Sequence, residues 1–371
     1  MEGEKLMGNV KIVDHGIVYT KPNAIFSYNG WPSICRCDDG SLLACFSGDR
    51  LEHVCPFGRV LAVRSLDEGK TWSAPITAIN TPLDDRDAGI VNLGHNRLLL
   101  TSFTNSREMQ RQCKEGRSDI KAELVRAYVS LITEEQEARY CGSTVSISED
   151  GGRTWGEPFL VPITAPHGPI RLRSGALLYA GTPFPASPQG APYPIHVYGS
   201  QDGRTFTKVG QVAMCPELSE GIFTEPHLVE LPSGRLVLHI RVQGVLSEEQ
   251  IFTICQSISD DGGKTWTVPQ PTGAQGAPPH LLQHSSGALL CTYGKRVGDR
   301  TGIRVMISED GAQTWEIDSI LWEEDADRPY KGDLGYPASV ELDNGDLLTV
   351  YYGVPNGQKM TSILWTRWRL R

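Results

Sequence analysis

Apolar and polar residues alternate along most of the chain in short runs that turn back on themselves. Six segments share one pattern, a strand, a polar turn and a second, leucine-rich strand: PSICRCDDGSLLACF, AGIVNLGHNRLLLTSF, HGPIRLRSGALLYAG, PHLVELPSGRLVLHI, PHLLQHSSGALLCTY and PASVELDNGDLLTVY. Five of the turns contain glycine, and the sixth contains Asn96. Alternation with a period of two is typical of half-buried strands, so the pattern predicts six β-hairpins.

A second repeat lies between these hairpins. Its common form is Ser-x-Asp-x-Gly-x-Thr-Trp, found at 65–72, 148–155, 259–266 and 308–315, with a degenerate copy at 200–206. In such a turn the aspartate accepts hydrogen bonds from backbone N–H groups, the glycine adopts a positive φ, and the tryptophan returns as a packing anchor. The repeat therefore predicts one recurring turn between strands.

The two repeats together indicate an all-β fold. Apart from a short helix predicted near 133–140, no long segment has helical periodicity. Six hairpins with recurring Asp-containing turns favour a six-bladed β-propeller. We expect a single domain over residues 1–371, with a loop or short-helix insertion around 104–142.

Composition and charge narrow the functions that are possible. The net charge of −9 would repel a nucleic acid, and no segment is long and apolar enough to predict a membrane span. The start, MEGEKLMGNVKIVDHG, has no apolar run of the kind that directs secretion, which predicts a cytoplasmic protein. Because no metal-ligand spacing, phosphate loop or dinucleotide motif occurs, we expect no cofactor and no metal. The sequence leaves the oligomeric state open.

The residues at the start of each hairpin are the first candidates for a ligand site. In a propeller the innermost strand of each blade begins near the central funnel, where ligands bind. The residues predicted at this mouth are Trp31, Asp87, Pro166, Glu225, Pro278 and Tyr336, with His167, His227 and His280 close by. Any one of them could equally satisfy a turn or contact a neighbouring blade, but together they favour a polar ligand.

Two segments make a more specific resemblance to the sialidase (neuraminidase) superfamily of Asp-box propellers. TEPHLVELPSGRLVLHIR resembles the family segment that begins with a glutamate and ends with a carboxylate-binding arginine, which places these on Glu225 and Arg241. GDLGYPASVELDNGDLLTVYY resembles the segment of the nucleophilic tyrosine, which falls on Tyr336. Arg300, eight residues before an Asp-box serine, stands where the family has its last carboxylate-binding arginine.

The resemblance implies a coherent chemistry. A sialic acid carries a carboxylate on its anomeric carbon, so a carboxylate nucleophile would be repelled, whereas a tyrosine activated by a glutamate avoids this repulsion. Arginines bind the sugar carboxylate in bidentate fashion. The implied function is an exo-acting glycoside hydrolase that removes a terminal sialic acid or a related acidic sugar from an oligosaccharide or glycoconjugate.

The chain departs from the family pattern in its first blade. Sialidases usually begin that blade with an aromatic-Arg-Ile-Pro motif, and alignment on the proline of NGWP puts Gly30 in the place of the arginine. The candidates to replace this arginine are Arg86, Arg50 and Arg59. Alternatively, Asp84, Asp85 and Asp87 could bind sugar hydroxyls.

The candidate general acid also differs from that of the family. The family carries an aspartate on the loop after the first hairpin, where this chain offers Glu52 and His53, with Asp49 further back. Asp87, facing Glu225 or His53 across the funnel, would suit a two-carboxylate or an inverting mechanism instead.

The sequence leaves two other classes of function open. The same fold could act as a neutral-sugar glycosidase or a polysaccharide lyase, with His53, His167 or His227 working beside Tyr336. It could also be a carbohydrate-binding propeller without catalysis, in which case replacing Tyr336 or Glu225 would change affinity only.

Overall fold

The computed structural model describes residues 9–184, 194–218, 221–246, 249–328 and 331–371. Its strands form six four-stranded antiparallel sheets, each made of strands that follow one another along the chain, except for the last. The six predicted hairpins are the two innermost strands of these sheets, and the predicted six-bladed β-propeller is confirmed.

The first three blades span residues 28–212. The first contains β2 (Tyr28–Arg36), β3 (Leu42–Arg50), β4 (Arg59–Ser65) and β5 (Ile76–Ile79). The second contains β6 (Arg86–Gly94), β7 (Arg97–Thr104), β8 (Gly142–Ser148) and β9 (Phe159–Val161). The third contains β10 (Ile170–Arg171), β11 (Leu177–Gly181), β12 (Ile195–Ser200) and β13 (Thr207–Val212).

The remaining blades complete the ring. The fourth contains β14 (Ile222–Glu230), β15 (Leu236–Leu246), β16 (Glu249–Ser259) and β17 (Gln270–Pro271). The fifth contains β18 (His280–Gln283), β19 (Leu289–Lys295), β20 (Gly302–Ser308) and β21 (Glu316–Glu323). The sixth contains β22 (Gly335–Glu341), β23 (Leu347–Gly353), β24 (Ser362–Leu370) and β1 (Val10–Tyr19).

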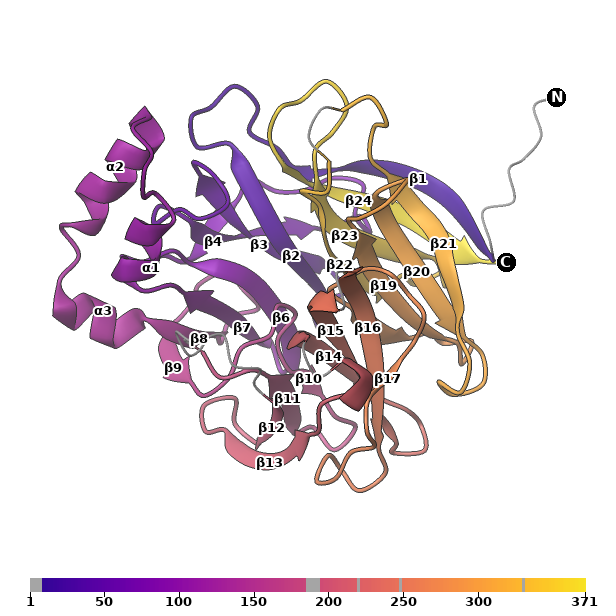
Figure 1. Cartoon of the computed structure of the whole chain (residues 1–371). Coiled ribbons are helices and arrows are strands. Elements are labelled where there is room, and N and C mark those ends of the chain that lie inside the picture. Colours follow the sequence, from indigo (N-terminus) through magenta and orange to yellow (C-terminus); the bar gives the residue numbers. More distant parts are fainter. Residues whose placement is uncertain (1–8, 185–193, 219–220, 247–248, 329–330) are drawn as a thin grey trace.

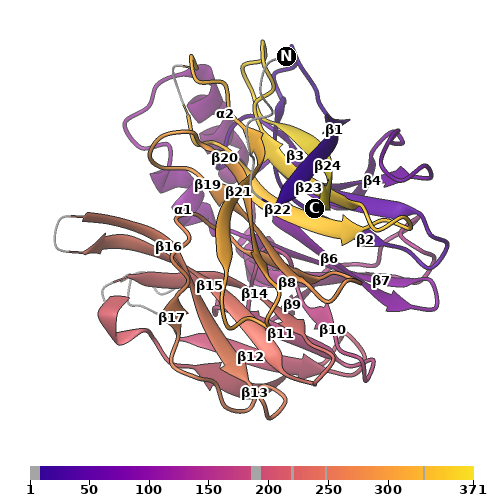
Figure 2. The same ribbon diagram turned by 90° about the vertical axis from the view of Figure 1, so that its right-hand side faces the viewer.

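The last blade joins the two ends of the chain. β1 pairs antiparallel with β24, so the N-terminal strand is the outermost strand of the C-terminal blade (Figure 1). This pairing closes the ring with backbone hydrogen bonds, which fixes the innermost strands around one axis. In Figure 2 the β15–β16 hairpin projects beyond the other strands.

The Asp-box turns have the predicted geometry. In the second blade the carboxylate of Asp150 accepts hydrogen bonds from the Thr154 N–H at 2.9 Å and the Ser148 hydroxyl at 2.8 Å. Gly152 has φ +84°, and its N–H donates to the Ser148 hydroxyl. Trp155 packs against the core between the first two blades. The turn thus links a blade's outer strands to the core between blades.

Three helices lie between β7 and β8 and gather outside the sheets (Figure 1). They are α1 (Arg107–Gln112), α2 (Ile120–Val129) and α3 (Glu134–Tyr140). The helix expected near 133–140 is α3, whereas α1 and α2 were not predicted. The helical pattern in the sequence of α2 is short. Its buried face consists of only Ala122, Val125 and Val129, spaced three and four residues apart after the Asp119 cap.

A 3₁₀ turn, η1, covers Pro216–Leu218. Over the described ranges, none of the helices has the length and apolar character needed to cross a membrane.

Candidate active site

Four blades share an unusual backbone feature at the start of the innermost strand. Trp31, Asp87, Glu225 and Tyr336 have φ values of +54°, +55°, +47° and +50°, a region that costs a side-chain-bearing residue about 1–3 kcal/mol. At each of them the pairing with the next strand is interrupted by a bulge. The four blades thus hold a tryptophan, two acids and a tyrosine in the same strained conformation at the same position.

Tyr336, Glu225 and Arg241 form one hydrogen-bonded group. The Tyr336 hydroxyl donates to Oε1 of Glu225 at 2.5 Å, and Arg241 binds the other carboxylate oxygen. A guanidinium nitrogen of Arg241 also lies 3.4 Å from the Tyr336 oxygen. Burial and the Glu225 charge raise the pKa of Tyr336 well above its usual value, so the phenol is protonated near pH 7 and its proton already points to Glu225. The arrangement can deliver a phenolate at the moment of attack.

Asp87 is a buried carboxyl beside this group. Desolvation and the charge of Glu225 raise its pKa to about 7. Three arginines, among them Arg86 and Arg241, act in the opposite direction and lower the pKa of Asp87. A carboxyl with such a pKa can give up a proton and take it back near neutral pH, as a general acid–base must.

Arg86 lies over the indole ring of Trp31, with 4.2 Å between the guanidinium carbon and the ring centroid. It donates to the backbone oxygen of His53 at 2.9 Å and to Nε2 of the same residue at 3.1 Å. Since arginine only donates, Nε2 must be the acceptor, and the ring proton is on Nδ1. Nδ1 lies 2.9 Å from the Tyr28 hydroxyl, which in turn donates to Asp333 at 2.9 Å. A continuous chain of hydrogen bonds from Asp333 through Tyr28 and His53 therefore holds the guanidinium of Arg86 in place.

Arg296 supplies a third cation, which the sequence reasoning missed. Its guanidinium carbon lies 5.2 Å from the centroid of the Tyr336 ring. Two of its buried nitrogens, and Nε of Arg86, have no hydrogen-bond partner in the described residues. Guanidinium N–H groups bind carboxylates and phosphates well, so these donors are available to an anionic group at this place.

The other predicted arginines lie outside the group around Tyr336. Arg300 forms an exposed ion pair with Glu323 at 2.7 Å, four residues beyond Arg296 in the sequence. Spacing alone could not choose between the two arginines. Arg59 approaches Asp49 at 3.9 Å, and Arg50 is fully buried.

Arg50 and Glu52 hold neighbouring structure in place. Arg50 binds Asp84 at 2.5 Å, and its guanidinium carbon lies 4.8 Å from the centroid of the Trp31 ring, beneath the site. Glu52 turns away to Lys114 and Arg117 of the helical segment.

Asp85 is likewise buried. Its carboxylate accepts hydrogen bonds from the N–H and hydroxyl groups of Thr81.

His53 faces the site but is poorly suited to donate a proton. Partial burial and the neighbouring cations Arg86 and Arg50 lower its pKa, so its imidazole is neutral near pH 7. Both ring nitrogens are engaged in the chain of hydrogen bonds described above.

His167, His227 and His280 lie deeper along the axis. The centroids of the His227 and His280 rings are 4.5 Å apart in a stack, and His167 meets both edge-on at 5.6 and 5.0 Å. The ring of His167 is 6.4 Å from that of Tyr336, so His167 connects the three imidazoles to the tyrosine. Among the residues that the structure describes, no group of three or more histidines, cysteines or acids is arranged to hold a metal ion.

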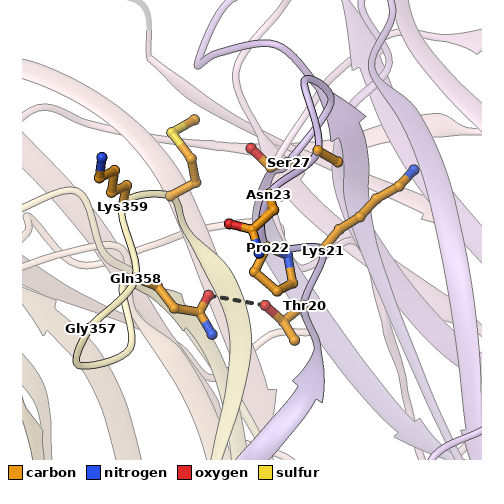
Figure 3. Close-up of a pocket in the computed structure, with 10 residues that line it drawn as sticks. Thr20, Lys21, Pro22, Asn23, Ser27, Gly357, Gln358 and Lys359 are labelled. Atoms are coloured by element: carbon orange, nitrogen blue, oxygen red, sulfur yellow. Dashed lines mark hydrogen bonds between the residues drawn. The ribbon is translucent and has the colours of Figure 1, made fainter.

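A separate pocket of about 390 Å³ lies between the β1–β2 and β23–β24 connections (Figure 3). Thr20 donates a hydrogen bond to Gln358 across it at 3.1 Å, and Lys21 and Lys359 come from its two sides. None of the residues around Tyr336 lines this pocket.

Comparison with known families and structures identifies the family. The profile of the BNR repeat-like domain family matches residues 118–349, which is more than half of the chain. The chain belongs to this family. No curated protein matches the sequence of this BNR repeat-like protein.

Solved structures share its propeller. A protein of unknown function from Dyadobacter fermentans has a TM-score of 0.77 and 23% identity, over 98% of this chain and 100% of that one. An intramolecular trans-sialidase from Ruminococcus gnavus, in complex with oseltamivir carboxylate, has a TM-score of 0.66 and 14% identity, over 95% and 97%. An α-L-arabinofuranosidase from Fusarium graminearum has a TM-score of 0.64 and 12% identity, over 97% and 98%. At these identities the likeness concerns the fold, which is shared with glycosidases of more than one specificity.

Proposed function

We propose that this protein is a retaining, exo-acting glycoside hydrolase that removes a terminal sialic acid or a related acidic sugar. The observation that carries the proposal is the Tyr336–Glu225 hydrogen bond of 2.5 Å within a group of arginines. A tyrosine nucleophile paired with a glutamate base suits an anomeric carbon that bears a carboxylate. The trans-sialidase among proteins of the same fold agrees with this interpretation.

In the first half of the reaction, the Tyr336 oxygen attacks the anomeric carbon while its proton passes to Glu225. Asp87, whose pKa is raised to about 7, gives its proton to the departing oxygen. The bond to the leaving group breaks, and a glycosyl–tyrosine intermediate remains. In the second half, Asp87 takes a proton from water and the water oxygen attacks the anomeric carbon. The bond from that carbon to the Tyr336 oxygen breaks, and Glu225 returns the proton to Tyr336.

Arg241, Arg296 and Arg86 would hold the sugar carboxylate. Arg86 replaces the family arginine whose position Gly30 occupies, but it comes from the second blade and not from the first. Its unpartnered Nε, like the buried nitrogens of Arg296, is a donor for which the carboxylate supplies an acceptor. Two aromatic carbons, Cε1 of Tyr28 and Cδ2 of Tyr352, would lie within 3.7 Å of a Cβ added at Gly30, so aromatic rings flank the position of the missing side chain.

The test is time-resolved proton NMR of the protein with 3′-sialyllactose, beside the variants Tyr336→Phe and Tyr351→Phe. Tyr351 is a buried tyrosine that bonds to Thr366 and serves as the matched control. We expect the α-anomer to appear first, with turnover lost in Tyr336→Phe and kept in Tyr351→Phe. Release of the β-anomer first would show an inverting reaction that does not use Tyr336. No release from sialosides or glucuronides would overturn the proposal and favour a binding propeller.

A further inference from the structure

The propeller has a further cavity on its axis, toward the turn ends of the innermost strands; its histidines lie on the side nearest Tyr336, with the His167 ring 6.4 Å from the Tyr336 ring. This axial cavity has a volume of about 520 Å³ and is lined by residues of all six innermost strands, β2, β6, β10, β14, β18 and β22. On each strand that carries a mouth residue, the cavity residues follow it, as His227 follows Glu225 and Ser339 follows Tyr336. The volume falls in the range that holds a small molecule.

Two of the histidines that line the axial cavity carry a ring proton on Nε2. The N–H of Leu281 donates to Nδ1 of His227 at 2.9 Å, and the N–H of Ser339 points to Nδ1 of His280 at 3.4 Å. A nitrogen that accepts a hydrogen bond carries no proton, so in the neutral ring the proton is on Nε2. These two Nε2 atoms therefore donate, and they lack the free lone pair that a metal ion would need.

His167 adds a polar atom without a partner. The residue is only 3% exposed, its Nδ1 lies 2.8 Å from the Ser33 hydroxyl, and its Nε2 has no partner in the described residues. A buried imidazole nitrogen is normally paired, so the lining is incomplete as it stands.

The entrance of the axial cavity is positively charged. Arg171 and Arg173 are both exposed there, and within the described ranges neither guanidinium forms an ion pair with a carboxylate. Glu230 is the one acidic residue of the lining, and it accepts the backbone N–H of Arg173 at 2.6 Å. In a chain with a net charge of −9, a cavity that combines unpaired arginines with imidazole donors is a local exception.

We infer that the axial cavity is a second ligand site, which binds a small molecule bearing a carboxylate or phosphate group. The arginines at the entrance draw in the anion, and the imidazole N–H groups of the lining donate hydrogen bonds to its acceptor oxygens. Apolar side chains such as Ile90, Leu228 and Leu281 enclose the rest of the molecule. Asp87, Glu225 and Tyr336 do not line this cavity, and the inference does not depend on glycosidase activity.

The experiment is isothermal titration calorimetry of the full chain at pH 7.5. Two probes, inorganic phosphate and glucuronate, distinguish a phosphate from a carboxylate ligand. The imidazole ¹⁵N signals are followed by NMR in the same titrations. We expect saturable binding of at least one probe, with shifts of the His227 and His280 Nε2 signals. The double variant Arg171→Ala/Arg173→Ala should weaken binding about tenfold or more, because two charge-assisted contacts are lost.

Two controls make the result decisive. Arg139→Ala/Arg204→Ala removes two exposed charges elsewhere and should leave binding unchanged. Arg241→Ala, in the site around Tyr336, should leave the binding of phosphate and the shifts of the Nε2 signals unchanged. The inference is wrong if neither probe saturates, or if the Nε2 shifts are lost in Arg241→Ala and kept in Arg171→Ala/Arg173→Ala. It is also wrong if Zn²⁺ in place of the anion shifts the Nε2 signals of all three histidines.

Discussion

The raised pKa of Asp87 makes a prediction about stability that needs no substrate. Its pKa is about 7 in the folded protein and 3.8 in an unfolded chain. Between these values the folded state binds more protons than the unfolded state, so the contribution of Asp87 to stability falls as pH rises and is lost above pH 7. One pKa unit corresponds to about 1.4 kcal/mol, and the whole loss is about 4 kcal/mol.

Asp87→Asn removes this dependence, because the amide resembles the protonated carboxyl and cannot ionise. Relative to the wild type, the free energy of unfolding of the variant should increase by about 3 kcal/mol between pH 5 and pH 8 and level off above pH 7. Urea denaturation of both proteins at pH 5, 6, 7 and 8 measures the difference. A variant that is more stable while losing turnover would show that the buried acid is kept for catalysis at the expense of stability.

Two further variants test the cause. Asp261→Asn replaces an exposed Asp-box carboxylate whose pKa its hydrogen bonds lower to about 2, so its effect should be constant from pH 5 to pH 8. In a Glu225→Gln background the gain from Asp87→Asn should shrink, since the neighbouring charge contributes to the raised pKa. The reasoning is refuted if the Asp87→Asn difference does not change with pH. It is equally refuted if the variant is less stable at pH 8, which would mean that the arginines hold Asp87 as an ion pair.

Three other outcomes follow. Arg86→Ala should lower kcat/KM for an acidic sugar by about 10- to 100-fold. Arg300→Ala should change it by less than about twofold, because Arg300 pairs outside the site. Equal effects of the two variants in steady-state kinetics would contradict the assignment. Lys114→Met leaves Glu52 without its buried partner and should lower the free energy of unfolding, measured by urea denaturation, by about 1–3 kcal/mol. No change would show that the ion pair does not contribute to stability. The pKa of His280 is about 3 against an ordinary 6.5, so folding loses stability as pH falls below 6.5. His280→Gln should reduce that loss by about 1.4 kcal/mol per pH unit, and an unchanged slope between pH 7 and pH 5 would contradict the lowered pKa.

Local pattern determined the repeating part of this protein. Alternation of apolar residues, a glycine or asparagine in each tight turn and the aspartate of each Asp box are short-range features, and the strands and turns formed where these features lie. The pairing of Glu225 with Tyr336, 111 residues apart, could also be inferred, because each residue stands at the start of an innermost strand. Equivalent positions on the blades of a propeller meet at its axis, so repeat position was enough to bring them together.

The tertiary structure decided the rest. Arg296 and Arg300 stand four residues apart on one connection, and only the path of that loop puts the first against Tyr336 and the second in solvent. The depth of His167, His227 and His280 likewise depends on how far each strand runs along the axis. The raised pKa of Asp87 arises from its burial beside Glu225, a property of the assembled ring. Sequence order specifies neither distance nor dielectric surroundings, and the chemistry of this site depends on both.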